Sequence, residues 1–292
     1  MQNVTEQESI ESHAGLSSDF QRVLQKSNGL DIRTKVCKLK VLCQERGEFG
    51  RAKEVVRMSE RQQGLAENLR RVREGIARAC ERRGRDVAEV RLVAVTKTVD
   101  VETARMLLEL GQVELGENRV QELAHKDGEL GDCGVVWHMI GHLQTNKVRK
   151  VLPICGFIHA VDSLRLAQEI SKRAGTIGAS PEILLEVNVS GEEAKFGLRP
   201  EEVPEVAGEV GQLPGVKLVG LMTMAPFVDD AELTRPVFVR LRELSERIAG
   251  IGLAGVSMRH LSMGMTQDYE VAVEEGATLV RVGSALFRGL ED

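Results

Sequence analysis

Residues 91–97 read RLVAVTK, a short apolar run that ends in polar residues, and the chain contains seven further runs of this kind. Runs rich in Val, Ile and Leu are typical of strands buried in a parallel sheet. The further runs are QVELGEN (112–118), VVWHMIG (135–141), GFIHAVD (156–162), EILLEVNV (182–189), KLVGLMTM (217–224), SMRHLSMG (257–264) and TLVRVGSA (278–285). Segments with helical apolar spacing separate them, including 100–110, 119–130, 163–174, 200–212, 231–248 and 267–275. This alternation indicates eight strands in repeated βα units.

Eight strands in this alternation favour a closed barrel over an open doubly wound sheet. A doubly wound sheet carries a glycine-rich phosphate turn after an early strand, whereas the turn after Val95 reads TKTVD. Barrels of this class commonly use roughly 250 residues as one domain. The sequence therefore predicts an α/β fold, a TIM-type (β/α)₈ barrel over residues 58–292, with an extension over residues 1–57.

The extension differs in character from the barrel region. Gln, Ser and Glu dominate its start, and Val41-Leu42-Cys43 is its longest apolar run. After Met58, the residues Leu65, Leu69, Val72 and Ile76 recur at helical intervals, and the Ser59 to Gln62 spacing fits a capping box. Two explanations of the extension stay open: a natural start at Met58, or a disordered or partly helical tail that contacts a partner.

Charge and cysteine content exclude several classes of function. Lys and Arg total 39 against 44 Asp and Glu, so the net charge of −5 gives no reason to expect nucleic acid or an anionic membrane as partner. The five cysteines are scattered, without the spacing of a disulfide framework or a zinc site. No apolar run approaches the roughly 18 residues of a membrane span. A cytoplasmic protein that binds a small molecule is the expectation.

Ligands of such barrels bind at the carboxyl ends of the strands. The polar residues at these ends are Lys97, Glu117, Asn118, His138, His142, Asn188, Ser190, Thr223, Ser262, Gly264, Arg281, Gly283 and Ser284. Lys97 follows the buried run Val93-Ala94-Val95, and a lysine amine that is buried and uncharged condenses with aldehydes. A strand-end lysine that extends into solvent fits the same pattern. Position alone therefore leaves both interpretations open.

The last two strands suit a phosphate. Val282-Gly283-Ser284 precedes a short apolar segment, and Ser262-Met263-Gly264 gives the same arrangement one strand earlier. Backbone N–H groups and hydroxyls at such turns bind phosphate at the usual barrel site. Arg281 lies in the middle of an apolar strand, where an unpaired charge is costly. It is either in a buried ion pair with Glu117 or Glu186, or a donor to a ligand.

Other polar residues carry weaker signals. His138, His142 and His260 lack a recognised metal spacing, so we assign no metal site. Cys133 and Cys155 have no base partner visible in sequence. Tyr269 is the only tyrosine, at the start of the segment after the seventh strand.

Seven motifs in order make the chain resemble the pyridoxal phosphate homeostasis protein family. They are AVTKT, LGENRVQE, WHMIGHLQTNK, EVNVSGEEAKFGL, GLMTMAP, LSMGMTQDYEVAVEEGAT and VRVGSALF. The resemblance runs from about Leu65 to Gly289 and does not cover residues 1–57. That family resembles the barrel domain of alanine racemase and of eukaryotic ornithine decarboxylase, but its members stop after the barrel.

The resemblance implies a cofactor, pyridoxal 5′-phosphate, and a role for each matching residue. Lys97 of AVTKT is the Schiff-base lysine, and Arg281 of VRVGS points at the pyridine nitrogen. Ser262 with Gly283 and Ser284 holds the phosphate, although many relatives have threonine where Ser284 stands. Asn118 of GEN lies near the ring, and residues 195–197 (KFG) belong to a loop over the mouth.

The resemblance also implies a monomeric protein that stores pyridoxal phosphate and supplies it to apo-enzymes, with little or no turnover. An arginine can only donate, so a ring nitrogen beside Arg281 stays unprotonated and the ring is a weak electron sink. Alanine racemase still racemises with such a ring, but there a tyrosine from the partner subunit's additional C-terminal domain delivers a proton to the second face of the substrate, and this family lacks that domain. An amino-acid racemase that uses His138, His142 or Tyr269 is the alternative, and a barrel for another phosphorylated ligand is a third.

Overall fold

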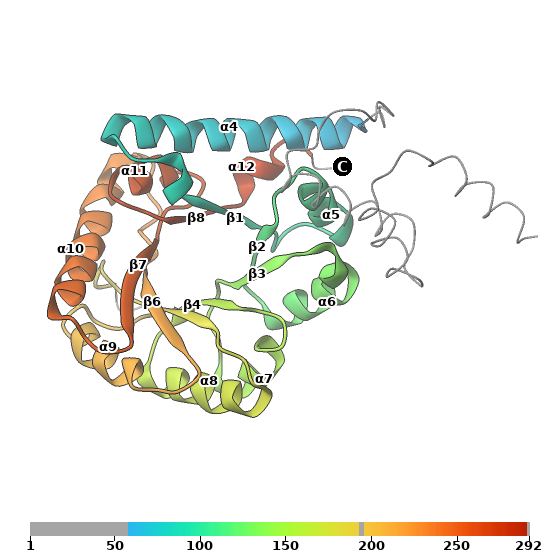
Figure 1. Ribbon diagram of the computed structural model, residues 1–292. Coiled ribbons are helices and arrows are strands. Elements are labelled where there is room, and N and C mark those ends of the chain that lie inside the picture. Colours follow the sequence, from blue (N-terminus) through green and yellow to red (C-terminus); the bar gives the residue numbers. More distant parts are fainter. Residues whose placement is uncertain (1–57, 193–195, 291–292) are drawn as a thin grey trace, which may run out of the picture. The chain divides into compact units, whose positions relative to one another are not determined.

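The computed structural model describes residues 58–192 and 196–290, and the predictions for residues 1–57 lie outside these ranges. Eight parallel strands close into a barrel in sequence order, each pairing with the next and the last with the first (Figure 1). The strands are β1 Arg91–Val95, β2 Glu114–Glu117, β3 Val136–Met139, β4 Phe157–Val161, β5 Glu182–Glu186, β6 Lys217–Met222, β7 Val256–Ser262 and β8 Leu279–Val282. The predicted (β/α)₈ barrel is confirmed.

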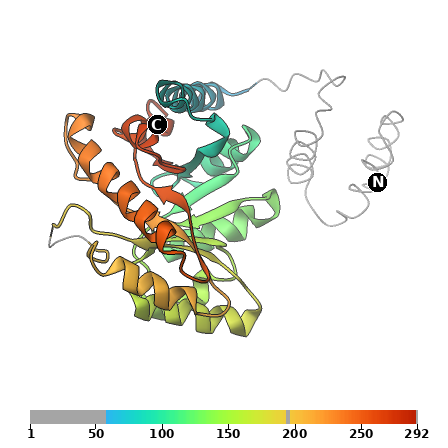
Figure 2. The ribbon, with the colours of Figure 1, turned by 60° about the vertical axis from the view of Figure 1, so that its left-hand side comes forward.

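Helices surround this sheet on its outer face (Figures 1 and 2). They are α4 Glu60–Arg83, α5 Val101–Glu109, α6 Val120–Leu130, α7 Val148–Val151, α8 Leu164–Ile177, α9 Val203–Gly211, α10 Arg235–Ile251, α11 Tyr269–Glu274 and α12 Ser284–Phe287. Short 3₁₀ turns are η1 Val87–Glu89, η2 Gly131–Cys133, η3 Thr145–Lys147 and η4 Ala231–Thr234. All six helical segments expected between the strands are found; the short helix α7 was not expected.

Helix α4 precedes the first strand and packs against α11 and α12, so it covers the seam where the barrel closes (Figure 1). Its apolar stripe, Leu65, Leu69, Val72 and Ile76, is buried as predicted. Ser59 caps the helix by accepting a hydrogen bond from the Gln62 N–H at 3.1 Å. The Gln62 side chain bonds to Glu109 of α5 instead of returning to the cap, so half of the predicted capping box forms.

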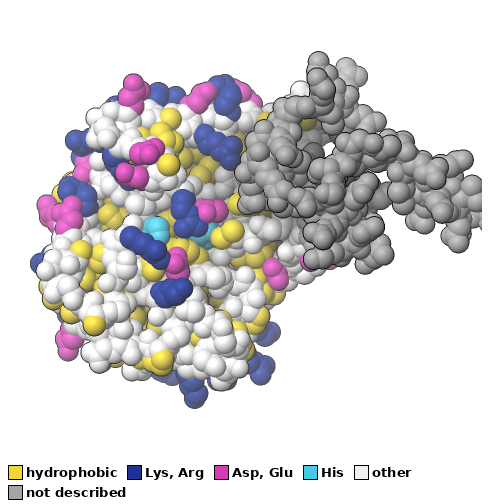
Figure 3. All heavy atoms as spheres, in the orientation of Figure 1, with side chains coloured by type: hydrophobic (Ala, Val, Ile, Leu, Met, Phe, Trp, Pro, Cys, Tyr) yellow, Lys and Arg dark blue, Asp and Glu magenta, His cyan; other side chains and the backbone are white. Residues whose placement is uncertain are grey.

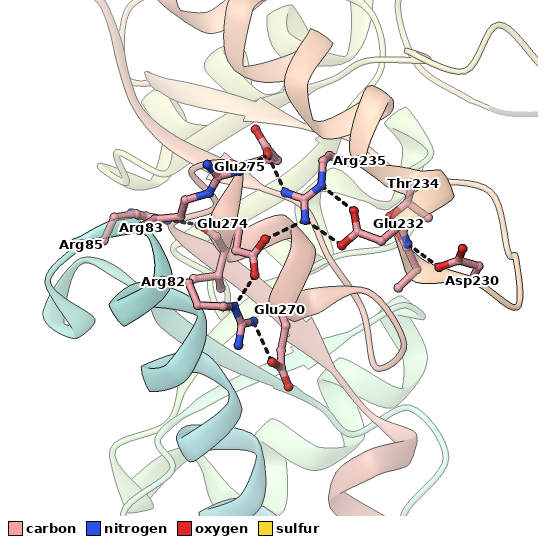
Figure 4. Close-up of polar contacts among 12 residues, drawn as sticks. Arg82, Arg83, Arg85, Asp230, Glu232, Thr234, Arg235, Glu270, Glu274 and Glu275 are labelled. Atoms are coloured by element: carbon pink, nitrogen blue, oxygen red, sulfur yellow. Dashed lines mark hydrogen bonds and ion pairs between the residues drawn. The ribbon is translucent and has the colours of Figure 1, made fainter.

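A network of ion pairs holds the same seam from outside (Figure 4). Arg82 of α4 binds Glu270 and Glu274 of α11, and Arg235 of α10 binds Glu274 and Glu275. Most of these side chains are partly exposed. The charges thus join the first helix to the last two barrel units without being removed from water.

Alternate residues of each strand face the barrel axis, where they form layers. The interior core contains Val93, Phe157, Ala160, Leu184, Val219, Met222 and Leu279. In Figure 1 the strands follow one another clockwise, which for right-handed crossovers is the view onto their amino ends. Charged and histidine side chains gather at the centre of this end (Figure 3).

Two ion pairs link neighbouring parts of the sheet towards this amino end. Arg91 at the start of β1 binds Glu114 of β2 at 2.7 Å, and Arg259 binds Glu182 of β5. The Arg91 guanidinium also lies 5.5 Å from the centre of the Phe157 ring. Ligands of such barrels bind at the opposite end, the mouth, where the strands have their carboxyl termini.

Candidate cofactor site at the carboxyl ends of the strands

Lys97 lies at the rim of the mouth, the end of the barrel formed by the carboxyl ends of the strands. Strand β1 ends at Val95, and the Val99 N–H bonds to the Thr96 carbonyl at 3.1 Å, which turns the chain outward. In a strand that continued, Lys97 would face the same side as Val93 and Val95, the barrel interior. Its side chain is instead exposed. Of the two interpretations that position left open, this exposure agrees with the lysine that extends into solvent, because the strand stops two residues earlier. The amine is accessible to a ligand at the mouth.

A buried ion pair fixes the backbone just before Lys97. Lys126 of α6 donates from Nζ to the Glu117 carboxylate and to the Thr96 carbonyl, both at 2.6 Å, and the Thr96 hydroxyl donates to the same carboxylate oxygen at 2.6 Å. All three residues are at most 2% exposed. This cluster ties the ends of β1 and β2 to α6. It therefore anchors the turn that carries Lys97.

Asn118 lies on the neighbouring rim, at the end of β2, and is half-buried. The loop after β3 passes directly over it: a Cβ on Gly141 would lie 2.4 Å from the Asn118 carbonyl oxygen. Only glycine allows this close approach. Asn118 is thereby held at the mouth, beside the turn of Lys97, and its place near the cofactor ring stays a prediction.

Arg281 is buried below the mouth, with 5% of its surface exposed. Its Nη1 donates to the Ser262 hydroxyl, and its Nη2 donates to the Thr223 carbonyl at 2.9 Å. A guanidinium carries five N–H groups, so donors remain for a ligand. The predicted alternative of an ion pair with Glu117 is wrong, because Glu117 pairs with Lys126. Glu186 acts on Arg281 only through its field.

Burial perturbs the charged groups around Arg281. Desolvation lowers the pKa of Arg281 to about 10, although Glu186 and Asp268 oppose this. Desolvation also raises the pKa of Glu186 to about 7, with a further contribution from Asp162. Among the described residues, Oε2 of Glu186 has no hydrogen-bond partner. The floor of the site thus contains a charged arginine and a carboxyl group that titrates near neutrality.

The two predicted phosphate turns lie together. The Arg281 N–H bonds to the Gly264 carbonyl at 3.0 Å, and the Ala285 N–H reaches the Thr266 hydroxyl at 3.4 Å. Gly264 has φ +90°, and a Cβ there would lie 2.5 Å from the Ala272 Cβ, so the turn requires glycine. The segments after β7 and β8 therefore form one continuous edge.

The predicted phosphate residues differ in accessibility. Gly283 is half-buried, and Ser284 at the start of α12 is exposed, so both are accessible to a phosphate. Ser262 is fully buried, and its hydroxyl lies between His159 and Arg281. In this arrangement its hydroxyl serves Arg281, and the predicted contact to phosphate stays a prediction.

The three residues considered as a second base lie in different places. His138 is fully buried below the mouth, and the Tyr269 hydroxyl packs against Gly75 of α4 on the outer helical layer. His142 lies at the rim, where its Nδ1 is 3.0 Å from the Asp162 carboxylate and its ring stacks on Phe196 at 4.2 Å. Of the three, only His142 is accessible from the mouth.

Sequence reasoning did not single out Lys126 or His159, and it named Thr223 only as a strand-end residue, without its contact to Arg281. Lys126 lies in a helix that appeared amphipathic, and His159 is one residue of the apolar run GFIHAVD. The available signal was a polar residue at a buried position, as it was for Arg281. Lys195 of the predicted loop motif lies outside the described residues.

The described residues, 58–192 and 196–290, contain neither a membrane-spanning helix nor a metal-binding cluster. No helix within them is both long and apolar enough for a membrane crossing. They also contain no group of three His, Cys, Asp or Glu side chains placed to hold a metal ion.

Comparison with known proteins identifies the family. Residues 63–291 match the family model described as the alanine racemase N-terminal domain. The chain is 45% identical over 221 residues to the pyridoxal phosphate homeostasis protein of Aquifex aeolicus, covering 76% of this chain and 96% of that protein. It is 36% identical over 227 residues to the protein of the same name from Escherichia coli K12, covering 76% and 95%.

A solved structure gives the same result. PipY of Synechococcus elongatus PCC7942, determined with PLP bound, is 34% identical and superposes with a TM-score of 0.67, covering 76% of this chain and 99% of PipY. The chain therefore belongs to the pyridoxal phosphate homeostasis protein family, which has the barrel of the alanine racemase N-terminal domain.

Proposed function

We propose that this protein binds pyridoxal 5′-phosphate as a Schiff base on Lys97 and acts in its intracellular homeostasis and supply, with little or no enzymatic turnover. The names of the curated relatives and the PLP-bound structure of PipY support this proposal. The single observation that carries it is Arg281, a buried guanidinium below the mouth with N–H donors available to a ligand.

The residues of the site fit the groups of this cofactor. The exposed amine of Lys97 is free to condense with the aldehyde, forming a C=N bond and releasing water. Arg281 would donate to the ring nitrogen, and Asn118 would line the ring. The phosphate binds at the edge formed by the segments after β7 and β8, with Gly283, Ser284 and Ser262 as its predicted partners.

Arg281 also limits the chemistry that the site supports. A guanidinium stays charged and has no acceptor, so it keeps the ring nitrogen unprotonated. When bound, the cofactor supplies an electron sink, and this sink is weakest when its ring nitrogen carries no proton. A masked aldehyde that is held and released fits these residues better than rapid turnover does. We further propose that the protein is a cytoplasmic monomer that hands the cofactor to apo-enzymes.

An amino-acid racemase is the second candidate, and one observation favours it. His142 lies at the rim with its Nδ1 3.0 Å from Asp162, an arrangement that orients an imidazole for proton transfer. Such an enzyme would use Lys97 on one face of the substrate and His142 on the other.

Two assays on the loaded protein distinguish storage from catalysis. In the first, a pyridoxal-phosphate-dependent apo-enzyme is mixed with the loaded protein, and we expect its activity to recover. In the second, D- and L-amino acids are supplied, and we expect no racemisation above the rate of free cofactor. Racemisation well above that rate, lost in both Lys97→Ala and His142→Gln, would establish the racemase instead. Lys150→Ala, at another exposed lysine, is the matched control.

A further inference from the structure

A chain of buried side chains runs through the barrel interior below Arg281. The Ser262 hydroxyl, which accepts from Arg281, lies 2.8 Å from Nδ1 of His159, and Nε2 of His159 lies 2.9 Å from Nδ1 of His138. These residues come from β8, β7, β4 and β3. Ser262, His159 and His138 are all fully buried. The chain therefore crosses the barrel beneath the site, out of contact with solvent.

The protonation states of these buried side chains determine which atoms donate hydrogen bonds. Burial lowers the pKa of His138 to about 3 and that of His159 well below its usual value, so both rings are neutral and carry one proton each. Arg281 can only donate. Ser262 accepts from Arg281 and has one hydrogen left, and Nδ1 of His159, 2.8 Å away, is the acceptor within reach of it among the described residues.

This assignment determines both tautomers. With Nδ1 as acceptor, His159 is protonated at Nε2 and donates to Nδ1 of His138. His138 is then protonated at Nε2, an atom without a hydrogen-bond partner among the described residues. The opposite tautomers would have Nδ1 of His159 donate to Ser262 and would leave the serine hydrogen unpaired in the interior, which costs free energy. Each hydrogen bond in this series is therefore donated away from Arg281, from Arg281 to Ser262, from Ser262 to His159 and from His159 to His138.

We propose that His159 is a positioning residue for Arg281. By accepting the Ser262 hydrogen, it fixes the hydroxyl so that a lone pair faces Nη1 of Arg281. Together with the Thr223 carbonyl on Nη2, this holds the guanidinium at two points in one orientation, that in which it donates to the ring nitrogen. The inference rests on the proposed function, because it concerns how the site holds pyridoxal phosphate.

A merely space-filling role for His159 makes a different prediction. His159→Leu keeps most of the volume and removes both nitrogens, whereas His159→Asn retains an acceptor close to the position of Nδ1. Ser262→Ala removes the hydroxyl itself with a small change in volume, and it serves if His159→Leu does not fold. A space-filling residue would be replaced better by leucine than by asparagine.

The test loads each variant with cofactor labelled with ¹⁵N in the pyridine ring. The ¹⁵N chemical shift reports whether the ring nitrogen is protonated, and spectral titration gives the dissociation constant. Thermal unfolding of the unloaded protein verifies the fold of each variant. We expect an unprotonated ring nitrogen in the wild type and in His159→Asn. In His159→Leu and Ser262→Ala we expect a shift towards the protonated form and roughly tenfold weaker binding, the effect of one hydrogen bond.

The outcomes separate this inference from the proposed function. If the folded His159→Leu and Ser262→Ala variants keep the wild-type ¹⁵N shift and affinity, His159 does not position Arg281, and the proposed function stands. If the wild-type protein does not take up the labelled cofactor, the proposed function fails and this inference fails with it.

Discussion

Two sets of charged and polar side chains lie in opposite surroundings. One is the outer network of ion pairs that joins α4 to α10 and α11, and the other is the set of buried polar groups in the interior of the protein. In the outer network, Arg235 binds three carboxylates, Glu232, Glu274 and Glu275, and several members stay partly in water (Figure 4). In the interior of the protein, Lys126 between α6 and the sheet and Arg281 within the barrel have few partners and almost no exposure. A basic side chain in the outer network thus has several partners, and water can replace each of them. A buried basic side chain has few partners, and water cannot replace them.

This difference has a physical consequence for stability and for function. An exposed ion pair contributes about 0–1 kcal/mol, because water competes for both partners. A buried charge that loses its partner costs several kcal/mol, because it cannot recover its hydration. The outer network therefore adds to a seam that apolar packing already closes. The buried polar groups hold the backbone before Lys97 and the guanidinium of Arg281 in place. Four substitutions test this contrast, and they follow in order of decreasing expected effect on the free energy of unfolding.

The largest effect is expected at the buried ion pair below Lys97. Lys126→Met leaves the fully buried Glu117 carboxylate without its cation, and we expect a loss of about 4 kcal/mol in the free energy of unfolding. Urea denaturation measures this loss. Adding Glu117→Gln to the same protein removes the unpaired charge and should restore most of the stability. A cost of Lys126→Met below that of an exposed pair would show that the interior is not as dry as its burial indicates.

The second effect concerns the buried histidines, which are neutral in the folded protein. The pKa of His138 falls from its usual 6.5 to about 3, so the unfolded chain binds the proton more readily than the folded one. Stability is therefore fully present above pH 6.5 and is lost as the pH falls towards 3. For His138 alone we expect a loss of about 3 kcal/mol between pH 7 and pH 4, and His159 acts in the same direction. His138→Leu should flatten the dependence of urea unfolding on pH, and an unchanged slope would contradict this.

Glu186 gives an effect of opposite sign. Its pKa is raised to about 7, so its unfavourable burial is absent at low pH and grows as the pH rises from its usual 4.5 through 7. Glu186→Gln removes this penalty. We expect the variant to be about 2 kcal/mol more stable than the wild type at pH 6 and equally stable at pH 4. The same urea titrations measure it, and a stabilisation independent of pH would point to a cause other than ionisation.

The smallest effect is expected in the outer network. Arg82→Met removes two ion pairs, but its side chain is 46% exposed and the acidic partner Glu274 keeps its contact with Arg235. We expect a loss below about 1 kcal/mol, and a smaller loss in high salt, because salt screens exposed charges. A loss as large as that of Lys126→Met would erase the contrast between the two regions.

Much of the fold could be predicted from the sequence, because it depends on short local patterns. RLVAVTK and TLVRVGSA each show a buried strand followed by a polar end, and the eight runs imply closure. Sequence left open whether Lys97 is buried or extends into solvent, because the answer depends on β1 ending at Val95 rather than two residues later. The contact between His159 and Ser262 joins residues 103 positions apart across the barrel. Such a contact follows from register and from side-chain rotamers, which periodicity does not give.

Buried polar residues were the useful signal within those patterns. Arg281 stood out because arginine is rare in an apolar strand, and the structure places it beneath the mouth. Its partners Ser262 and Thr223 could not be chosen over Glu117 or Glu186 from sequence, because hydrogen-bond partners depend on the facing strands. Lys126 was overlooked because a lysine in an amphipathic helix is usually exposed.

The most direct test of the central claim is the position of the cofactor. The purified protein is incubated with pyridoxal 5′-phosphate, reduced with borohydride, digested and mapped by mass spectrometry, with Lys97→Ala and Lys150→Ala treated in parallel. We predict a visible absorbance band that reduction abolishes and a pyridoxyl group on the peptide that contains Lys97, in the wild type and in Lys150→Ala but not in Lys97→Ala. A protein that stays colourless and unlabelled, or one labelled equally after Lys97→Ala, would contradict a Schiff base on Lys97.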